Sequence, residues 1–291
     1  MSILPERMRS GGTWVRPDKR RPNYFLPCSL EGNGEIYHFD EEPLILPKDL
    51  GYGYYPVALG DVIPFGRASL RVVRKLGWAN GSTVWLCLND QVDSKLQQKY
   101  VALKIETAFN HHLPSTEAQC FEGMKRQITR GAQFCLPLLA QQTLSSLHGD
   151  HRSFVTPITG PDLIELAESR GSMYSLPVVR KIIRQVLLGL EHMHACGFLH
   201  CDVKCDNVVV RLPDESLDIT IDELLKNSPP ETYPPVAVPA LYSEPYITLK
   251  SQPISPLWLE PDLRNLEVQL IDYGEGMSCV LDIQVLSDPL L

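Results

Sequence analysis

The sequence has no run of about 18 apolar residues, so no segment of it is expected to span a membrane as a helix. It also lacks an excess of positive charge: Lys and Arg number 27, Asp and Glu number 35, and the formal net charge is −8. An acidic chain is a poor general binder of nucleic acid, so we expect neither a nucleic-acid nor a membrane partner. Hydrophobic residues make up 44% of the 291 residues, which excludes wholesale disorder.

No secretory signal opens the chain, and the chain is much longer than the small domains that disulfides hold together. We therefore expect its 8 cysteines to be reduced thiols in an intracellular protein of the cytoplasm, the nucleus or both. The first 22 residues hold six Arg and Lys against two acidic residues. Such a start is either an organelle transit peptide or a disordered basic tail, and its weak periodicity favours the tail.

Residues 1–50 are rich in Pro and Gly and show little periodicity, which predicts an extended or disordered arm. A helix is expected near 115–130, with Ser115 as its N-cap and Glu117 in its first turn. Three β-rich runs precede this helix in the sequence and one follows it, and a turn with Gly77 lies between the first two. These runs cover residues 71–76, 83–88, 100–105 and 151–158.

The clearest helical pattern covers residues 177–195, which Pro177 begins and Gly197 ends. Its apolar residues are expected on one face. They are Val178, Val179, Ile182, Ile183, Val186, Leu187, Leu190 and Met193.

Residues 211–265 differ from the rest in composition. They hold 10 of the 24 prolines, no glycine and no cysteine, and nine acidic residues against four basic ones. This pattern predicts an acidic insertion or linker, with a short helix possible around 219–225. A strand at 268–271 then leads into Asp272-Tyr273-Gly274.

Four motifs that suit phosphoryl transfer occur in order and in matching elements. A turn of small residues, such as the one within 76–84, lets backbone N–H groups approach phosphates. A lysine on the next strand can reach the same phosphates, and carboxylates can bind a metal and orient a nucleophile. The motifs are residues 76–84, Val101-Ala102-Leu103-Lys104, residues 200–207 and Asp272-Tyr273-Gly274.

With these motifs, the chain resembles the eukaryotic protein-kinase family over residues 40–275, and within it most of all the SR-protein kinases. The latter likeness rests on Gly53-Tyr54-Tyr55-Pro56, on Arg74-Lys75-Leu76-Gly77-Trp78, on the non-Arg residue Cys201, and on the long insert. The resemblance implies an α+β, bilobal protein-kinase-like fold. A kinase domain would occupy 51–291, with a β-rich N-lobe at about 68–160 and an incomplete α-helical C-lobe at 161–291.

The resemblance also implies roles for individual residues. Asp202 would be the catalytic carboxylate and Lys204 would steady the transferred phosphate, while Asn207 and Asp272 would bind Mg²⁺. Glu117 would pair with Lys104 in the active state, with Glu122 as the alternative partner. The expected ATP-binding residues are Leu76, Gly77, Ala79, Ser82, Val84, Ala102, Lys104, Glu117, Thr156 and Ile158.

By this resemblance the chain would be an ATP- and Mg²⁺-dependent serine/threonine kinase that acts on proteins, specifically Arg/Ser-rich proteins of RNA splicing. Only 17 residues follow Gly274, and they contain no Ala-Pro-Glu-like motif. The kinase would therefore be truncated, and the apolar face of helix 177–195 would be left partly exposed. The alternative hypothesis is an impaired kinase-like module that binds ATP or a partner without phosphoryl transfer.

A third hypothesis is a metal site made of His192, His194, Cys196, His200, Cys201 and Cys205. Their spacing matches no established zinc pattern, so this hypothesis ranks last.

Overall fold

The computed structural model describes residues 28–32, 35–39, 41–44, 46–79, 81–90, 96–111, 113–171, 173–212, 217–235, 247–254 and 263–278. The chain divides into two compact units. The first comprises Met1–Leu113, Leu138–Ile158 and Pro213–Ile254, and the second comprises Pro114–Pro137, Thr159–Leu212 and Ser255–Leu291. The helix expected near 115–130 thus belongs to the second unit, and most of the acidic insert belongs to the first.

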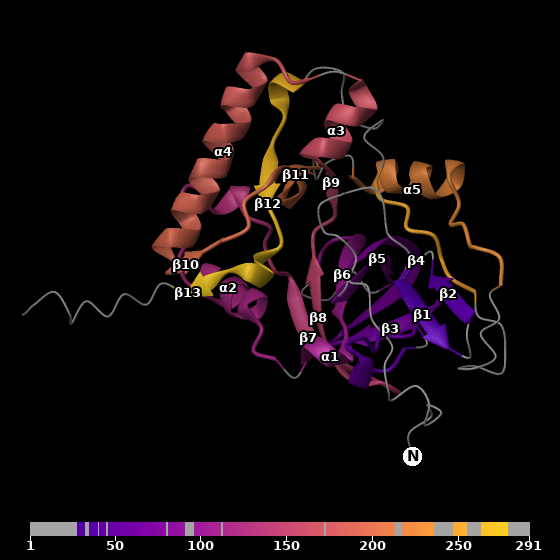
Figure 1. Ribbon diagram of the computed structural model, residues 1–291. Coiled ribbons are helices and arrows are strands. Elements are labelled where there is room, and N and C mark those ends of the chain that lie inside the picture. Colours follow the sequence, from indigo (N-terminus) through magenta and orange to yellow (C-terminus); the bar gives the residue numbers. More distant parts are fainter. Residues whose placement is uncertain are drawn as a thin grey trace, which may run out of the picture. The chain divides into compact units, whose positions relative to one another are not determined.

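A six-stranded antiparallel sheet forms the centre of the first unit (Figure 1), with the strand order β3-β4-β5-β6-β8-β7. Its strands are rich in Val, Leu, Ile and aromatic residues, which favour a pleated and partly buried surface. The β-rich runs expected from the sequence are confirmed as β4, β5, β6 and β8. The strands are β3 (Val62–Phe65), β4 (Ala68–Ala79), β5 (Ser82–Asn89), β6 (Tyr100–Glu106), β7 (Ala140–Ser146) and β8 (Gly149–Thr156).

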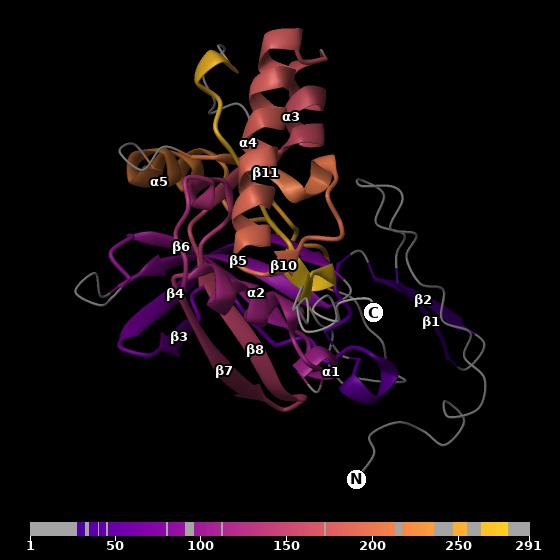
Figure 2. The same cartoon turned by 90° about the vertical axis from the view of Figure 1, so that its left-hand side faces the viewer.

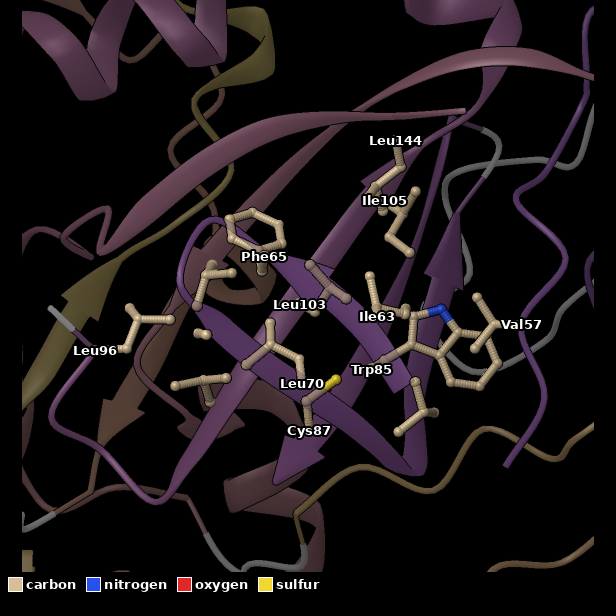
Figure 3. Close-up of a cluster of buried hydrophobic side chains, with 14 residues drawn as sticks. Val57, Ile63, Phe65, Leu70, Trp85, Cys87, Leu96, Leu103, Ile105 and Leu144 are labelled. Carbon is tan, nitrogen blue, oxygen red and sulfur yellow. The ribbon is translucent and has the colours of Figure 1, made fainter. Parts of the chain in front are cut away.

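One face of this sheet carries the hydrophobic core of the unit (Figure 3). Trp85 lies next to Ile63 and Val57, and Leu103 lies near Leu70. Trp85 and Leu103 are directly opposed in the register of β5 and β6, so they point to the same side. Because side chains alternate along a strand, Val84 and Lys104 point to the opposite side.

The last part of the arm expected over residues 1–50 contains regular secondary structure. A hairpin pairs β1 (Cys28–Gly32) with β2 (Glu35–Phe39), and a short 3₁₀ helix covers Lys48–Leu50. Ile36, Tyr37 and Phe39 have high β-propensity, which outweighs the Pro and Gly content around them. Residues 1–27 lie outside the described residues.

The acidic insert is more ordered than its composition indicates. Its helix α5 (Leu217–Asn227) contains the expected 219–225 segment and buries Leu217, Ile221 and Leu224. Asp222 on this helix accepts from Lys99 Nζ at 2.7 Å and from Tyr100 Oη at 2.6 Å. The insert therefore packs on the sheet of the first unit at α5, which periodicity alone predicted only as a possible helix.

Among its described residues, the second unit contains three α-helices, a three-stranded antiparallel sheet in the order β12-β11-β9 and the short pair β10-β13. Helix α4 lies alongside β12 (Figure 1), and its length is also seen in the second view (Figure 2). The helices are α2 (Thr116–Met124), α3 (Leu163–Arg170) and α4 (Leu176–Ala195). The strands are β9 (Thr159–Asp162), β10 (Phe198–Leu199), β11 (Val208–Arg211), β12 (Val268–Leu270) and β13 (Met277–Ser278). Short 3₁₀ helices cover Ala132–Phe134, Cys205–Asn207, Leu263–Asn265 and Tyr273–Glu275.

Two local predictions about these helices are confirmed. The Ser115 side chain caps α2 by accepting from the Ala118 backbone N–H at 3.1 Å. Gly197 follows α4 with a φ of +83°, a left-handed conformation that ends the helix. Helix α2 ends at Met124, earlier than expected, because the chain turns at Lys125 and Arg126.

The predicted apolar face of α4 is only partly correct. Its buried residues are Ile182, Gln185, Gly189, His192 and Met193, whereas Ile183 and Leu187 are 52% and 59% exposed. Gln185 is buried because its amide bonds the backbone of the neighbouring strand region, accepting from the Val268 N–H at 2.8 Å and donating to the Leu266 carbonyl at 3.0 Å. The helix is therefore rotated toward these backbone groups, and it leaves an exposed apolar patch at Ile183 and Leu187.

Across the described residues, no helix is both long enough and apolar enough to cross a bilayer.

Candidate active site

The residues expected to bind ATP from the sheet lie on neighbouring strands of the first unit. Val84 is opposed to Gly77 on one side and to Lys104 on the other, and Ala102 is opposed to Thr156. Directly opposed residues share a face of the sheet, as do residues two apart along one strand. The register therefore brings Val84, Ala102, Lys104 and Thr156 together on the face opposite the hydrophobic core.

The small-residue turn connects β4 to β5, where Ala79 is opposed to Ser82 and Gly77 to Val84. Leu76 and Gly77 are half-buried, Ser82 is buried and Ala79 is exposed. Asn80 lies outside the described residues. The turn thus places backbone N–H groups at the end of a hairpin, the arrangement in which kinase glycine-rich loops cover phosphates.

Ile158, just beyond β8, is buried at 3% exposure, and Thr156 at the end of the same strand is 8% exposed. Both belong to the first unit and follow the strand that pairs with β6. Their predicted role in ATP binding stays a prediction.

The predicted catalytic loop, residues 200–207, belongs to the second unit and holds three side chains together. Lys204 Nζ lies 2.9 Å from Asp202 Oδ2, and the Asn207 amide donates to the same oxygen at 3.0 Å. The Asn207 amide also donates to the Asp202 carbonyl at 2.9 Å. Asp202 and Lys204 keep 34% and 42% of their side-chain surface exposed, so a substrate can reach both.

Charge in this loop is set by the same contacts. Hydrogen bonding from Lys204 lowers the pKa of Asp202, with a smaller contribution from Asn207. The bond to Asp202 raises the pKa of Lys204, and the nearby carboxylates of Asp206 and Asp272 act in the same direction. Asp202 is therefore a carboxylate and Lys204 an ammonium ion at neutral pH.

The side chains of His200 and the buried Tyr273 support the predicted catalytic loop. The His200 ring stands edge-on to Tyr273 at 5.8 Å, and its Nε2 lies 3.0 Å from the Ile271 carbonyl. The Asp202 N–H donates to His200 Nδ1 at 3.4 Å, so the neutral ring carries its hydrogen on Nε2. These contacts fix the backbone at both Asp202 and the neighbouring Asp272.

Asp272 and Asn207 offer oxygen ligands of the kind that Mg²⁺ prefers. The Ile271 N–H donates to the Asn207 carbonyl at 3.0 Å, which places Asp272 next to Asn207 along paired backbone. Asp272 is exposed, and its φ of +61° is the left-handed conformation. The residues present therefore fit a metal held by one carboxylate and one amide oxygen, with substrate and water supplying the remaining ligands.

Among the described residues, no group of three or more His, Cys, Asp and Glu side chains is arranged to hold a metal. His192 instead lies 3.1 Å from the Thr129 hydroxyl, and Cys196 lies close to the His192 ring. This finding argues against the cluster of histidines and cysteines as a metal centre.

The expected site residues are divided between the two units. Lys104 belongs to the first unit, whereas Glu117 on α2 belongs to the second. Their pairing stays a prediction. The alternative partner, Glu122, is half-buried, and its carboxylate lies 3.2 Å from the Lys125 ammonium group at the end of the same helix.

The hydrogen bonds that the Tyr273 hydroxyl makes with backbone carbonyls were not predicted from the sequence. The ring is fully buried and edge-on to Phe121 of α2 at 5.2 Å. Its hydroxyl donates to the Leu270 carbonyl at 2.8 Å and lies 3.3 Å from the Leu136 carbonyl. A tyrosine where the resembled family has phenylalanine was the available signal, because a buried hydroxyl needs a partner.

Comparison with protein families supports a protein-kinase assignment. The family model described as "Protein kinase domain" matches residues 70–222, just over half of the chain. Among solved structures, the chain is similar to the BubR1 kinase domain, with a TM-score of 0.47 and 16% identity over 78% of this chain and 53% of that one.

Curated relatives give higher identities. The chain is 35% identical to the serine/threonine-protein kinase spk-1 of Caenorhabditis elegans, over 64% of this chain and 18% of that protein. It is 32% identical to SRSF protein kinase 3 of Sus scrofa, over 65% and 32% of the two chains. It is 33% identical to the serine/threonine-protein kinase SRPK of Physarum polycephalum, over 54% and 36%.

The matching region thus spans about a third or less of the length of most of these relatives. The matched residues nevertheless include the small-residue turn, Lys104 and the whole catalytic loop. The chain therefore belongs to the protein kinase family, and the curated proteins that it resembles are serine/threonine kinases of the SR-protein type.

Proposed function

We propose that this chain transfers the γ-phosphate of ATP to serine or threonine hydroxyls of proteins. The observation that carries the proposal is the contact of both Lys204 and Asn207 with one oxygen of Asp202, Oδ2. These two donors hold the carboxylate in place and leave the other oxygen, Oδ1, to accept the hydrogen bond of a substrate hydroxyl. A carboxylate that orients the attacking hydroxyl is what phosphoryl transfer requires.

The other residues have supporting roles. The Lys204 ammonium group lies close enough to Asp202 to meet the phosphoryl group as it approaches the hydroxyl. Lys104 would contact the ATP phosphates, and the turn at Gly77 and Ala79 would cover them with backbone N–H groups. Asn207 and Asp272 would hold Mg²⁺, which neutralises the negative charge on the phosphates when it is bound.

The substrates that we propose are Arg/Ser-rich proteins of RNA splicing. The support is the likeness to kinases whose names specify SRSF proteins or SRPK, together with the net charge of −8, which favours basic substrates. Cys201 stands where most protein kinases have the arginine that pairs with a phosphorylated activation segment, so activity would not depend on that phosphorylation.

The test is phosphate transfer from labelled ATP with Mg²⁺ to an Arg/Ser-repeat peptide. The matched control is Asp202→Asn, which keeps the size of the side chain and removes its charge. Transfer that the control abolishes supports the kinase. Thermal stabilisation by ATP without any transfer would instead identify a nucleotide-binding module that does not phosphorylate. A peptide with Arg replaced by Ala tests whether the substrate must be basic.

A further inference from the structure

The turn between β4 and β5 is held on its first arm by a buried tyrosine. Tyr54, only 1% exposed, donates from its hydroxyl to the carbonyl of Ala79 at 2.8 Å. Its ring also packs edge-on against Trp78 of the same arm, with centroids 6.2 Å apart and planes at 80°. One side chain therefore fixes both the backbone and the neighbouring indole where the turn begins.

The second arm is held by a different group. The Gly81 carbonyl accepts from the backbone N–H of Thr107 at 2.9 Å and from the Asn110 side-chain amide at 3.2 Å. The approach is so close that a Cβ on Gly81 would collide with the Asn110 side-chain nitrogen. A larger residue at position 81 would therefore displace the Asn110 side chain.

Both groups that hold the turn belong to one connected piece of structure. The short helix α1 (Ala108–His111) carries Asn110 and begins with an N–H that donates to the Gly53 carbonyl at 2.8 Å. Gly53 has a φ of +80° and immediately precedes Tyr54. The segment 52–54 and helix α1 thus form one platform, and the two arms of the turn are bonded to it.

We infer that Tyr54 and Asn110 are positioning residues for the nucleotide-binding turn, which they hold in its ATP-binding shape before ATP arrives. This inference rests on the proposed function, since it assumes that the turn covers the phosphates. A loop that is already ordered loses less conformational freedom when it binds a ligand, so the affinity for ATP rises without any direct contact from Tyr54 or Asn110.

The experiment uses the full chain with Tyr54→Phe and Asn110→Asp, alone and combined. Each variant removes one donor and keeps the size of the side chain. The matched control is Tyr174→Phe, because the Tyr174 hydroxyl donates to the Leu163 carbonyl at 2.5 Å within the second unit, whereas the turn belongs to the first. The three measurements are ATP affinity by calorimetry with Mg²⁺, KM and kcat for ATP, and hydrogen exchange of residues 76–84 without nucleotide.

Each single variant is expected to raise the dissociation constant and the KM for ATP roughly five-fold, the effect of one lost hydrogen bond. At saturating ATP, kcat is expected to stay near the wild-type value, and amides of residues 76–84 should exchange faster. Tyr174→Phe should change none of these quantities. A purely structural role for Tyr54 would lower stability and kcat together and would leave the KM for ATP unchanged.

The results separate this inference from the function on which it rests. Equal exchange rates of the turn in the wild type and the double variant, measured without nucleotide, would overturn the positioning role. Unchanged ATP affinity in the double variant would overturn it too. A wild-type chain that binds no ATP would overturn the proposed function, whereas faster exchange of the turn in the variants would still support the hold that Tyr54 and Asn110 exert.

Discussion

The ammonium nitrogen of Lys75 lies 2.8 Å from Glu41 Oε2 and also contacts the carboxylate of Glu42, and the Lys75 side chain is fully buried. Glu41 is satisfied further by Ser251, whose N–H and hydroxyl both donate to it at 2.7 Å. The cluster joins three stretches of the first unit that are far apart in sequence. Lys75 directly precedes Leu76, where the nucleotide-binding turn begins.

Glu42 gives this cluster a dependence on pH. Burial raises the pKa of Glu42 from its usual 4.5 to about 7, despite the attraction of Lys75, and the neighbouring Glu41 adds to the rise. A carboxyl whose pKa is raised by folding stabilises the fold fully below pH 4.5, and that contribution is lost as the pH rises through about 7. We expect the free energy of unfolding to fall by on the order of 3 kcal/mol across this window. Urea denaturation at several pH values measures it, and Glu42→Gln should remove most of the slope.

Replacing Lys75 by methionine would leave two buried carboxylates without their cation. We expect Lys75→Met to lower the free energy of unfolding by about 3 kcal/mol, because an unpaired buried charge is costly. The matched control is Lys99→Met, since Lys99 is 37% exposed and pairs with Asp222 at 2.7 Å. That surface pair should contribute less than about 1 kcal/mol. Equal losses in the two variants, measured by urea denaturation, would contradict this account of the cluster.

Gly189 permits the close contact between α4 and its neighbours. A Cβ at this position would lie 2.9 Å from the Phe134 carbonyl oxygen and 3.0 Å from a Leu270 methyl group. Gly189→Ala should therefore cost roughly 1–3 kcal/mol of stability, although alanine has the higher helix propensity. His194→Ala on the exposed side of the same helix serves as the control and should have little effect. A stabilised Gly189→Ala variant in thermal unfolding would show that the helix can move away.

The exposed apolar patch on α4 should promote self-association. Ile183 and Leu187 are 52% and 59% exposed, beside a hollow lined partly by Arg180 and Arg184. Apolar patches of this kind are interaction or aggregation sites. Sedimentation velocity at increasing concentration should show association of the wild type and much less of Leu187→Glu. Leu147→Glu, at a residue 76% exposed outside α4, should behave as the wild type does.

Local signals predicted much of the fold. The strands of the central sheet, the cap at Ser115 and the end of α4 at Gly197 depend on residues within a few positions of each other, so a single sequence contains the information. The roles of Asp202, Lys204 and Asn207 came from the resemblance to protein kinases and stay predictions, but the three residues lie within six positions and make direct contacts, as a local motif would.

Long-range contacts set the remainder. The sequence pattern placed Ile183 and Leu187 on the same apolar face as Ile182 and Met193, but backbone groups at Leu266 and Val268 bind Gln185 and determine which side of the helix is covered. The buried Glu41 and Glu42 could not be foreseen either, since their partner Lys75 is more than 30 residues away. Nothing local indicates which acidic residue will meet a buried cation.

The alternation along β5 and β6 has a practical consequence for directed evolution. Trp85 and Leu103 support the core, whereas Val84 and Lys104, one position away on each strand, face the proposed nucleotide site. Two mutant libraries that differ by a single-residue offset should therefore give different phenotypes. The library at Trp85 and Leu103 should yield insoluble protein. The library at Val84 and Lys104 should yield soluble protein with altered nucleotide selectivity.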